Sequence, residues 1–332
     1  MVPKKHRVYL TRVLPGEGME RILRNYDAEV FPGDAPPDRE TILRGVRGRE
    51  ALVCLLTDPV DREIMEAGPL RIIANYAAGY NNIDVEAATE LGIIVTNTPG
   101  VLSETTADLT WALLLSAARR IVEGDRFMRE GRFKGWAPTL LLGRDIYGKT
   151  LGVIGAGSIG SAVMRRALGF GMRVLYNSRR RKPELEEELG AKWATLKDLL
   201  KESDFITIHV PLTEETYHLI GEREFRLMKD GAVLVNVARG PVVDEEALVE
   251  ALKEGKLFSA ALDVYEREPE VHPDLLQMDN VVLAPHIGSA SLATRSRMAS
   301  MVADSLDDFF SGRVPKNVVN PEVLEKLHLK PR

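Results

Sequence analysis

The sequence of 332 residues contains one cysteine, Cys54, so no intrachain disulfide can form. It has no run of about 18 apolar residues, which a membrane-spanning helix requires, and the basic N-terminal stretch lacks the apolar segment of a leader. Basic residues are not in excess, with 44 Lys and Arg against 49 Asp and Glu. This balance disfavours a general binder of nucleic acids or membrane surfaces. We therefore expect a soluble, cytoplasmic protein in which Cys54 is buried and inert.

Several catalytic patterns are also missing. No cluster of His, Cys and Asp has the spacing of metal ligands, and no G-x-S-x-G sequence is present, so we expect neither a metal site nor a serine hydrolase. We find no internal repeat and no low-complexity segment. Four histidines have no partner pattern and are predicted to lie on the surface: His6, His218, His272 and His328.

A glycine motif stands near the middle of the chain. In LGVIGAGSIG, Gly155, Gly157 and Gly160 follow an apolar run and precede a helical pattern, and a second predicted strand, 173–176, comes at the distance of a βαβ unit. The first glycine permits a tight turn, the second lets backbone approach a pyrophosphate, and the third lets helix and strand pack closely. A purely structural glycine turn is the alternative. The predicted cradle for a dinucleotide comprises Gly155, Gly157, Ser158, Ile159 and Gly160.

Alternating strand and helix patterns predict an α/β fold of two domains with parallel sheets. Breakers at 97–100 and a plausible crossing at 288–291 divide the chain into a discontinuous domain, 1–99 plus 289–332, and a doubly wound Rossmann domain, 100–288. The first has predicted strands at 8–11, 51–56, 72–75 and 93–97. The second has six, at 151–154, 173–176, 205–210, 232–236, 260–264 and 281–284.

A long apolar helix is predicted from Glu104 to Gly131, with Thr105 and Asp108 in capping-box spacing and Trp111, Ile121 and Val122 among its apolar residues. Helical periodicity cannot tell whether this surface is buried between domains or forms a dimer interface.

Three consecutive predicted strands lead to charged side chains: Arg239 after 232–236, Asp263 and Glu268 near the end of 260–264, and His286 after 281–284. The carboxyl ends of parallel strands meet at one edge, so we expect these groups in one cleft. The arginine fork suits a substrate carboxylate, and the histidine suits an acid/base whose pKa a carboxylate such as Glu268 would raise. Taken alone, Arg239 could be a turn residue, and Glu268 could belong to a solvated charge run.

The glycine motif, NVARGPVVDEEAL, AALDVYEREP and LAPHIGSA resemble the D-isomer-specific 2-hydroxyacid dehydrogenase family over nearly the whole chain, most of all its archaeal-type glyoxylate and hydroxypyruvate reductases. The resemblance implies a flavodoxin-like substrate domain, a homodimer through the long helix and its following loop, and binding of substrate by Arg239, with His286 as acid/base and Glu268 as its partner. It implies that Asp263 contacts the nicotinamide carboxamide. It also implies a substrate site that includes Leu56, Ala78, Gly79 and Trp136, and cofactor contacts from Thr106, His209, Pro211, Ala238 and Gly288. Trp136 could equally be a packing residue.

The cofactor is indicated by the strand after the glycine motif, which ends in YNSRRR. Asn177 and Ser178 stand where NAD enzymes carry an acid, and Arg179 and Arg180 follow. A ribose 2′-phosphate is held by hydroxyl and guanidinium groups, so we expect NADP(H), with NAD(H) as the second choice. Charge-assisted hydrogen bonds contribute about 1.5–3 kcal/mol each, so two would shift the preference about a hundredfold or more. The alternative is that these arginines pair with nearby Glu184, Glu186 and Glu187.

The resemblance therefore implies a reductase of small 2-oxo acids, turning glyoxylate into glycolate or hydroxypyruvate into D-glycerate. A phosphoglycerate or D-lactate-type dehydrogenase is an alternative, the first disfavoured because no further domain follows the last predicted helix. A cofactor-sensing binding protein is an alternative of another class, since the family also contains a transcriptional co-repressor. The presence of Arg239, Glu268 and His286 favours an enzyme.

Overall fold

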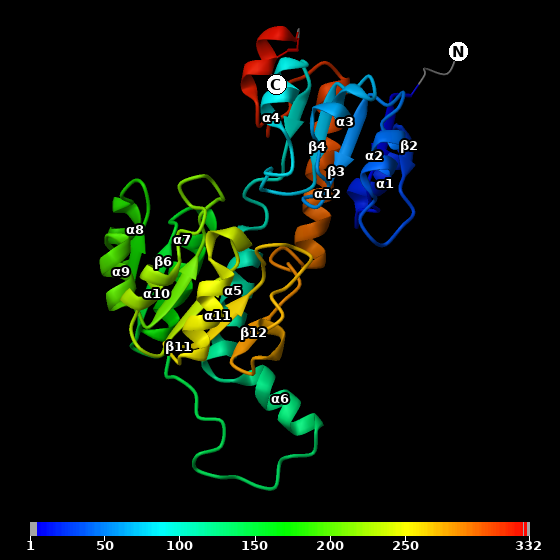
Figure 1. Cartoon of the computed structure of the whole chain (residues 1–332). Helices are drawn as coiled ribbons and strands as arrows, with labels where there is room; N and C mark the ends of the chain where they lie inside the picture. Colours follow the sequence, from blue (N-terminus) through cyan, green and yellow to red (C-terminus); the bar gives the residue numbers. More distant parts are fainter. Residues whose placement is uncertain (1–4, 328, 331–332) are drawn as a thin grey trace. The chain divides into compact units, whose positions relative to one another are not determined.

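The computed structural model describes residues 5–327 and 329–330, so His328 lies outside the described residues. The chain forms two compact units, Met1–Leu102 with Ser289–Arg332, and Ser103–Gly288 (Figure 1). We call them the terminal unit and the central unit and describe each by itself. None of the helices in the described residues is long and apolar enough to cross a membrane.

The terminal unit is a parallel five-stranded sheet with the order β2-β1-β3-β4-β5, which is the flavodoxin-like order. Its strands are β1 (Arg7–Leu10), β2 (Asp27–Val30), β3 (Ala51–Cys54), β4 (Ile72–Asn75) and β5 (Ile94–Thr96). Its helices are α1 (Glu17–Asn25), α2 (Arg39–Gly45), α3 (Arg62–Glu66), α4 (Val85–Glu90) and α12 (Leu292–Phe310), followed by a 3₁₀ helix at Pro321–Lys326. One core lies between the sheet and α1 and α12, and a second between the sheet and α2, α3 and α4. Cys54 is fully buried, as expected.

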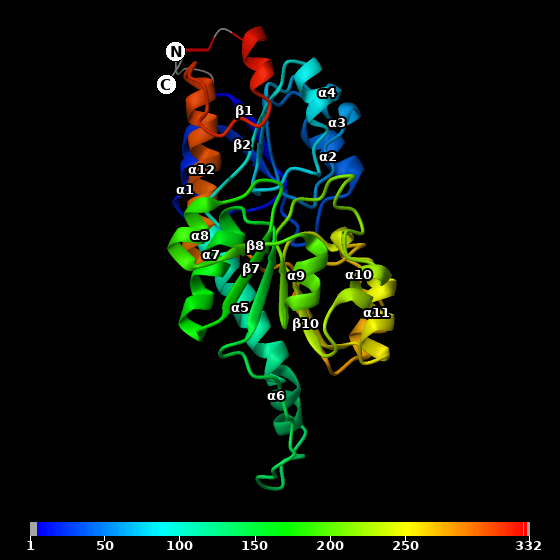
Figure 2. The same ribbon diagram turned by 90° about the vertical axis from the view of Figure 1, so that its left-hand side faces the viewer.

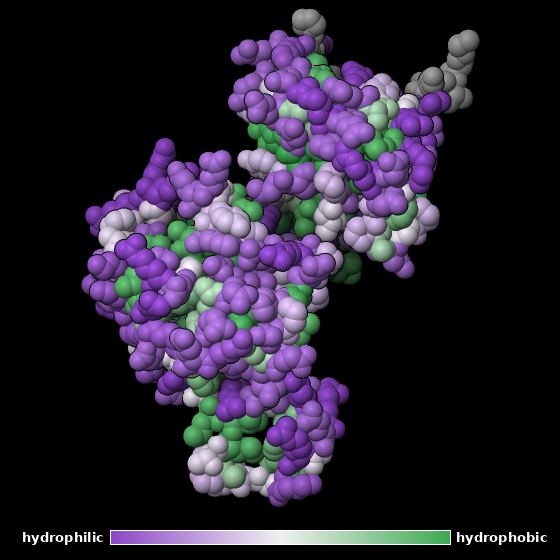
Figure 3. Space-filling model, in the orientation of Figure 1, coloured by the Kyte–Doolittle hydropathy of each residue, from purple (hydrophilic) through white to green (hydrophobic). Residues whose placement is uncertain are grey.

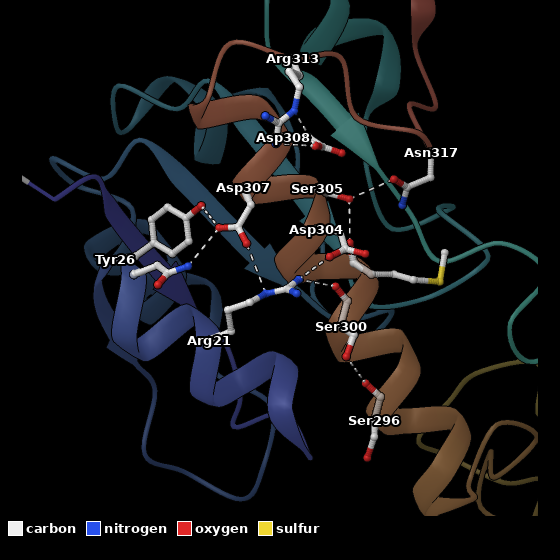
Figure 4. A network of polar contacts seen from close by, with 12 residues as sticks. Arg21, Tyr26, Ser296, Ser300, Asp304, Ser305, Asp307, Asp308, Arg313 and Asn317 are labelled. Carbon is white, nitrogen blue, oxygen red and sulfur yellow. Dashed lines mark hydrogen bonds and ion pairs between the residues drawn. The ribbon is translucent and has the colours of Figure 1, made fainter. Parts of the chain in front are cut away.

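Helix α12 is fastened to α1 although the two helices lie near opposite ends of the chain (Figure 4). A Cβ atom at Gly18 would lie 2.2 Å from the backbone of Ala299, so the two helices approach too closely for any side chain there. The Arg21 guanidinium donates to Ser300 O at 2.9 Å and to Asp304 Oδ1 at 2.5 Å. The last helix is therefore an integral part of the terminal unit.

The central unit is a parallel seven-stranded sheet with the order β12-β11-β10-β9-β6-β7-β8. The strands are β6 (Thr150–Ile154), β7 (Arg173–Asn177), β8 (Lys192–Trp193), β9 (Phe205–Ile208), β10 (Ala232–Asn236), β11 (Leu257–Leu262) and β12 (Val281–Leu283). The order reverses between β6 and β9, which is the Rossmann arrangement and marks the ligand crevice at the carboxyl ends of these strands. The predicted fold class is confirmed. This sheet has one more strand than expected, because β8 is only two residues long and leaves no apolar run in the sequence.

The helices of the central unit, except α6, cover both faces of its sheet. They are α5 (Ser103–Ala118), α6 (Ile121–Arg129), α7 (Ser158–Ala167), α8 (Pro183–Leu189), α9 (Leu196–Glu202), α10 (Glu222–Leu227) and α11 (Glu245–Lys253), with 3₁₀ turns at Leu168–Phe170, Gly240–Val242 and Leu275–Gln277. Residues of α5, α7 and α8 share one core with the sheet, and residues of α9, α10 and α11 share the other.

The prediction of one helix over 104–131 is wrong. The chain breaks at Arg120, which has a left-handed backbone with φ 53°, so α5 and α6 are separate helices. Helix α5 begins at Ser103, which places Thr105 inside the first turn instead of at a cap. Trp111 is buried in the core of the central unit, whereas α6 buries none of its residues, and Ile121 is 57% exposed. Figures 1 and 2 show α6 and the following loop reaching out from the rest of the central unit.

Candidate functional site

The glycine motif forms the turn from β6 into α7. Gly155 has φ +100°, and a Cβ there would lie 2.7 Å from the His209 backbone. A Cβ at Gly160 would lie 1.9 Å from Gly155 O, whereas one at Gly157 would meet no atom within 4 Å. Gly157 is also the N-cap of α7, where the first backbone N–H groups have no partner within the helix. Two glycines thus allow close packing and one leaves open space beside free N–H groups, which fits a bound pyrophosphate.

The loop after β7 presents two free guanidinium groups. Arg181 makes a bidentate ion pair with Glu186, at 2.9 and 2.8 Å. The alternative that the arginines of this loop pair with nearby glutamates is therefore correct for Arg181. Within the described part of the chain, the side chains of Arg179 and Arg180 have no hydrogen bond or ion pair, and both residues are exposed. Ser178 Oγ donates to Arg180 O at 2.5 Å, which shapes the loop.

The same loop is braced from β8, the strand that the sequence analysis missed. Asn177 Nδ2 donates to Ala194 O at 2.9 Å, and Trp193 Nε1 donates to Ser178 O at 3.2 Å. Asn177 therefore holds the loop through its side chain, and Arg179 and Arg180 extend from a fixed backbone.

Arg239 follows β10 in a turn that a buried asparagine holds. Asn236 Nδ2 donates to Arg239 O at 3.0 Å, and its Oδ1 accepts from Ala238 N–H at 3.0 Å. The Arg239 guanidinium donates to Ala238 O at 2.6 Å and has no ion pair with an acid among the described residues. Its burial lowers the pKa of Arg239, while the charge of Glu268 opposes that shift. Asn236 was not among the predicted site residues, although its position at the end of a buried strand was an available clue.

Glu268 and His286 form a direct pair. His286 Nδ1 lies 2.8 Å from Glu268 Oε2, and the side chains are 26% and 30% exposed, respectively. Glu268 Oε1 accepts from Tyr265 N–H at 3.0 Å. Burial by itself raises the pKa of Glu268, but the hydrogen bond and positive charge of His286 outweigh it and hold that pKa below its usual value. The pair therefore favours a carboxylate beside a histidine that keeps its other ring nitrogen, Nε2, for a reacting group.

Asp263 holds the turn that carries His286. Its two carboxylate oxygens accept from Ile287 N–H at 2.7 Å and from Gly288 N–H at 2.8 Å, and Thr106 Oγ1 donates to Gly288 O at 3.1 Å. Asp263 is 1% exposed, and burial raises its pKa. These contacts fix His286 in a left-handed backbone with φ 52°, a conformation that few residues other than glycine adopt. Thr106 and Gly288, expected at the cofactor, thus also support the histidine.

His209 and Pro211 follow β9, next to the glycine turn. Both ring nitrogens of His209 are buried and have no hydrogen-bond partner in the described structure. Burial lowers the pKa of His209 to about 3, so the ring is neutral. Unpaired buried nitrogens are costly, and they mark this ring as able to accept a polar partner from a ligand.

The other residues expected at the substrate lie in the terminal unit or in the exposed loop after α6. Leu56, Ala78 and Gly79 belong to the terminal unit, where Asn97 Nδ2 donates to Ala78 O at 2.7 Å and Asn75 Nδ2 to Gly79 O at 2.8 Å. The backbone N–H groups of Ala78 and Gly79 donate to no described group, so they are free for a ligand. Trp136 follows α6 and is 84% exposed, which excludes packing inside its own central unit.

Three of the four histidines predicted to lie on the surface are partly buried and have acidic partners. His218 is half-buried against Glu266, and His6 pairs with Glu50 and stacks on Phe310. His272 is partly buried and lies 3.1 Å from Glu246. A fixed sequence spacing could not reveal these partners, because each comes from a distant segment. Among the described residues, no group of three His, Cys, Asp or Glu could hold a metal ion.

Comparison with known proteins agrees with this architecture. Residues 111–288 match the family profile described as D-isomer specific 2-hydroxyacid dehydrogenase, NAD binding domain. A protein from Korarchaeum cryptofilum named glyoxylate reductase is 55% identical over 325 residues, 97% of this chain and 98% of that protein. A crystal structure of a protein from Thermus thermophilus is 47% identical with a TM-score of 0.89, covering 94% of this chain and 99% of that one.

A second solved structure carries ligands. It is an NADPH-dependent glyoxylate/hydroxypyruvate reductase from Sinorhizobium meliloti in complex with NADP and malonate, 32% identical with a TM-score of 0.83, covering 96% of this chain and 98% of that one. Identity of this extent over whole chains, together with the family profile, settles the family. The chain belongs to the D-isomer specific 2-hydroxyacid dehydrogenases and is an NAD(P)-dependent oxidoreductase.

Proposed function

We propose that this protein is an NADPH-preferring reductase of glyoxylate and hydroxypyruvate. The observation that carries the proposal is the His286–Glu268 pair at 2.8 Å, together with a half-buried Arg239 that lacks an acidic ion-pair partner in the described structure. The name of the Korarchaeum relative supports glyoxylate as a substrate. A nicotinamide cofactor, when bound, would supply a hydride for the carbonyl carbon.

The residues of the chain supply binding and the proton. Arg239 presents a planar fork that suits a carboxylate or carbonyl oxygen. In the terminal unit, the backbone N–H groups of Ala78 and Gly79, which donate to no described group, suit a carboxylate. His286 donates from Nδ1 to Glu268, and its Nε2–H gives the proton to the substrate oxygen. Glu268 stabilises the positive charge on the ring before the transfer. Asp263 holds the turn at Ile287 and Gly288, and its remaining lone pairs suit the nicotinamide amide group.

One assay tests the function. NADPH oxidation is measured with glyoxylate, hydroxypyruvate, pyruvate and phosphohydroxypyruvate, and kcat/KM is expected to be highest for the first two. Highest activity on phosphohydroxypyruvate or pyruvate would replace the proposal by a phosphoglycerate or D-lactate-type dehydrogenase. Cofactor binding without turnover of any of the four would indicate a cofactor-sensing protein.

The preference for NADPH rests on Arg179 and Arg180. Their free guanidinium groups extend from a braced loop, and no acid occupies the position of Asn177 and Ser178. The NADPH-dependent Sinorhizobium relative, solved with NADP, is consistent with this preference. Both guanidinium groups are exposed, so solvent weakens each contact to the 2′-phosphate relative to a buried one.

The double substitution Arg179→Gln and Arg180→Gln is expected to lower kcat/KM for NADPH about 30-fold and for NADH less than about twofold. Arg181→Gln is the matched control, because Arg181 is already paired with Glu186 in the same loop. Steady-state kinetics with both cofactors measures the ratio. Equal losses with NADPH and NADH, or an equal effect of the control, would contradict the assignment.

We also propose a homodimer formed through α6 and the loop after it. Exposed apolar side chains gather on this projection, and Figure 3 shows a hydrophobic region around its base. They are Ile121, Val122, Met128, Phe133, Trp136 and Leu142. Contiguous apolar surface of this kind is typical of a protein interface, and a second copy of the chain would cover it.

A further inference from the structure

His218 lies in the loop between β9 and α10, and its environment is unusual for a loop residue. Its backbone has φ 47°, in the left-handed region, and its ring stacks on Tyr217 with centroids 4.1 Å apart. His218 Nε2 lies 3.0 Å from Glu266 Oε1, and Nδ1 lies 3.8 Å from Asp244 Oδ2. Such a backbone is retained only where surrounding contacts fix it. The contacts to two acids provide that reason.

Glu266 is tied to the start of α11 by a reciprocal pair of hydrogen bonds. Glu245 N–H donates to Glu266 Oε2 at 3.2 Å, and Glu266 N–H donates to Glu245 Oε1 at 2.7 Å. Glu245 is 8% exposed, and its burial raises its pKa, with the charge of Glu266 adding to the shift. Asp244, which caps α11, adds a third carboxylate. The His218 ring contacts two of these three acids, Glu266 and Asp244.

This cluster adjoins the residues of the proposed acid/base pair. Glu266 follows Tyr265, whose N–H donates to Glu268 Oε1 at 3.0 Å, and the Tyr265 hydroxyl donates to Ala284 O at 2.8 Å. Ala284 lies two residues before His286, and His286 N–H donates to its carbonyl oxygen at 3.1 Å. A shift of the backbone at Tyr265 and Glu266 would therefore move the Glu268 carboxylate away from the His286 ring.

We propose that His218, together with Glu266 and Glu245, is a positioning clamp that fixes the turn at residues 265–268 and thereby holds Glu268 against His286. The inference rests on the proposed function, since it assigns His218 a role only through that pair. His218 itself is not a catalytic residue, because its ring contacts Glu266, Asp244 and Tyr217 and its backbone N–H donates to Pro241 O at 2.8 Å, and none of these four residues is proposed to bind substrate or cofactor.

The test variant is His218→Asn. Asparagine accepts a left-handed backbone but is too short to reach Glu266. We expect kcat to fall about tenfold while KM for the 2-oxo acid stays within about twofold. This is typical of residues that orient a catalytic group without contacting the substrate. Glu266→Gln is expected to have a similar effect. His272→Asn is the control. His272 contacts Glu246 of α11, at 3.1 Å, and makes no hydrogen bond to the turn at residues 265–268. It should leave kcat unchanged.

A double-mutant cycle with Glu268→Gln shows whether the effect runs through Glu268. If it does, His218→Asn lowers kcat in the wild-type background and has almost no further effect when Glu268→Gln is present. Additive losses, or wild-type kcat for both His218→Asn and Glu266→Gln, would overturn the clamp. An undisturbed kcat in Glu268→Gln alone would instead refute the role of Glu268 in the proposed mechanism, and the clamp with it.

A measurement that needs no turnover accompanies the kinetics. The pH titration of His286, followed by NMR of histidine-labelled protein, should move in His218→Asn toward the curve of Glu268→Gln. Cofactor affinity and the midpoint of thermal unfolding identify a variant that has simply failed to fold. A folded variant with a wild-type His286 titration would contradict the inference even if the substrate has been assigned wrongly.

Discussion

Substitution of His286 by asparagine is expected to lower kcat about 1,000-fold with either glyoxylate or hydroxypyruvate, within the usual range for loss of a general acid. Asparagine suits the test because it tolerates the left-handed backbone at φ 52°, which alanine does not. Its side chain cannot give up a proton, so the substrate oxygen must take one from water. The measurement is steady-state kcat at saturating substrate and NADPH.

The effect of this substitution should be confined to the chemical step. The glycine turn and the loop with Arg179 and Arg180 are separate from the residue that is changed, so the Kd for NADPH should stay within about twofold of the wild-type value. Fluorescence titration measures it. A folded His286→Asn protein that binds NADPH and keeps full kcat would remove His286 as the acid.

The second large effect is expected for Arg239→Lys, which should lower kcat/KM for the 2-oxo acid about 300-fold. Lysine keeps the positive charge but loses the planar fork, and removal of one oriented donor at a developing charge costs about 100- to 1,000-fold. The loss is expected to be large because Arg239 is half-buried, and charges that are partly removed from water are screened less than exposed ones. Asn236 binds only backbone atoms of this turn, so the turn itself should be retained in the lysine variant.

Kinetics with glyoxylate and with hydroxypyruvate, at fixed saturating NADPH, give kcat and KM separately. If Arg239 orients both carboxylate and carbonyl, both parameters should worsen. An increase of KM alone would limit Arg239 to binding of the carboxylate, and an unchanged kcat/KM would contradict any role at the substrate. Guanidine added to an Arg239→Ala protein should restore part of the activity, since it can supply the missing donors.

Much of the fold could be predicted because parallel strands buried on both faces appear as short apolar runs between helical patterns. Predicted strands 72–75 and 232–236 coincide with β4 and β10. The misses have physical reasons. β2 is DAEV and is half exposed at the edge of its sheet, and β8 has two residues, so neither has an apolar run. The break at Arg120 is invisible to periodicity, because Ile121 and Val122 continue the apolar pattern.

The residues that the sequence suggested for chemistry follow the strands as expected, because a strand end is a local property of the sequence. The residues that hold these side chains in place could not be predicted in the same way. Asp263 uses both oxygens on the backbone of a turn 24 and 25 residues away, and Asn236 uses its amide on backbone atoms of its own turn. Whether a carboxylate or amide side chain forms hydrogen bonds with backbone groups depends on the path of the loop. The charge pattern of a sequence does not reveal that path. His218 was misjudged for the same reason.

The contacts of Asp263 also determine which part of the protein carries His286, the proposed acid. Gly288, held by Asp263 and Thr106, is the last residue of the central unit before the chain enters the terminal unit at Ser289. His286, the proposed proton donor, its partner Glu268 and the glycine turn therefore belong to one compact unit and are held there by its own residues. Under the proposed mechanism the acid/base geometry is prepared in advance, so substrate binding need only deliver the carbonyl and does not have to assemble the groups that react with it.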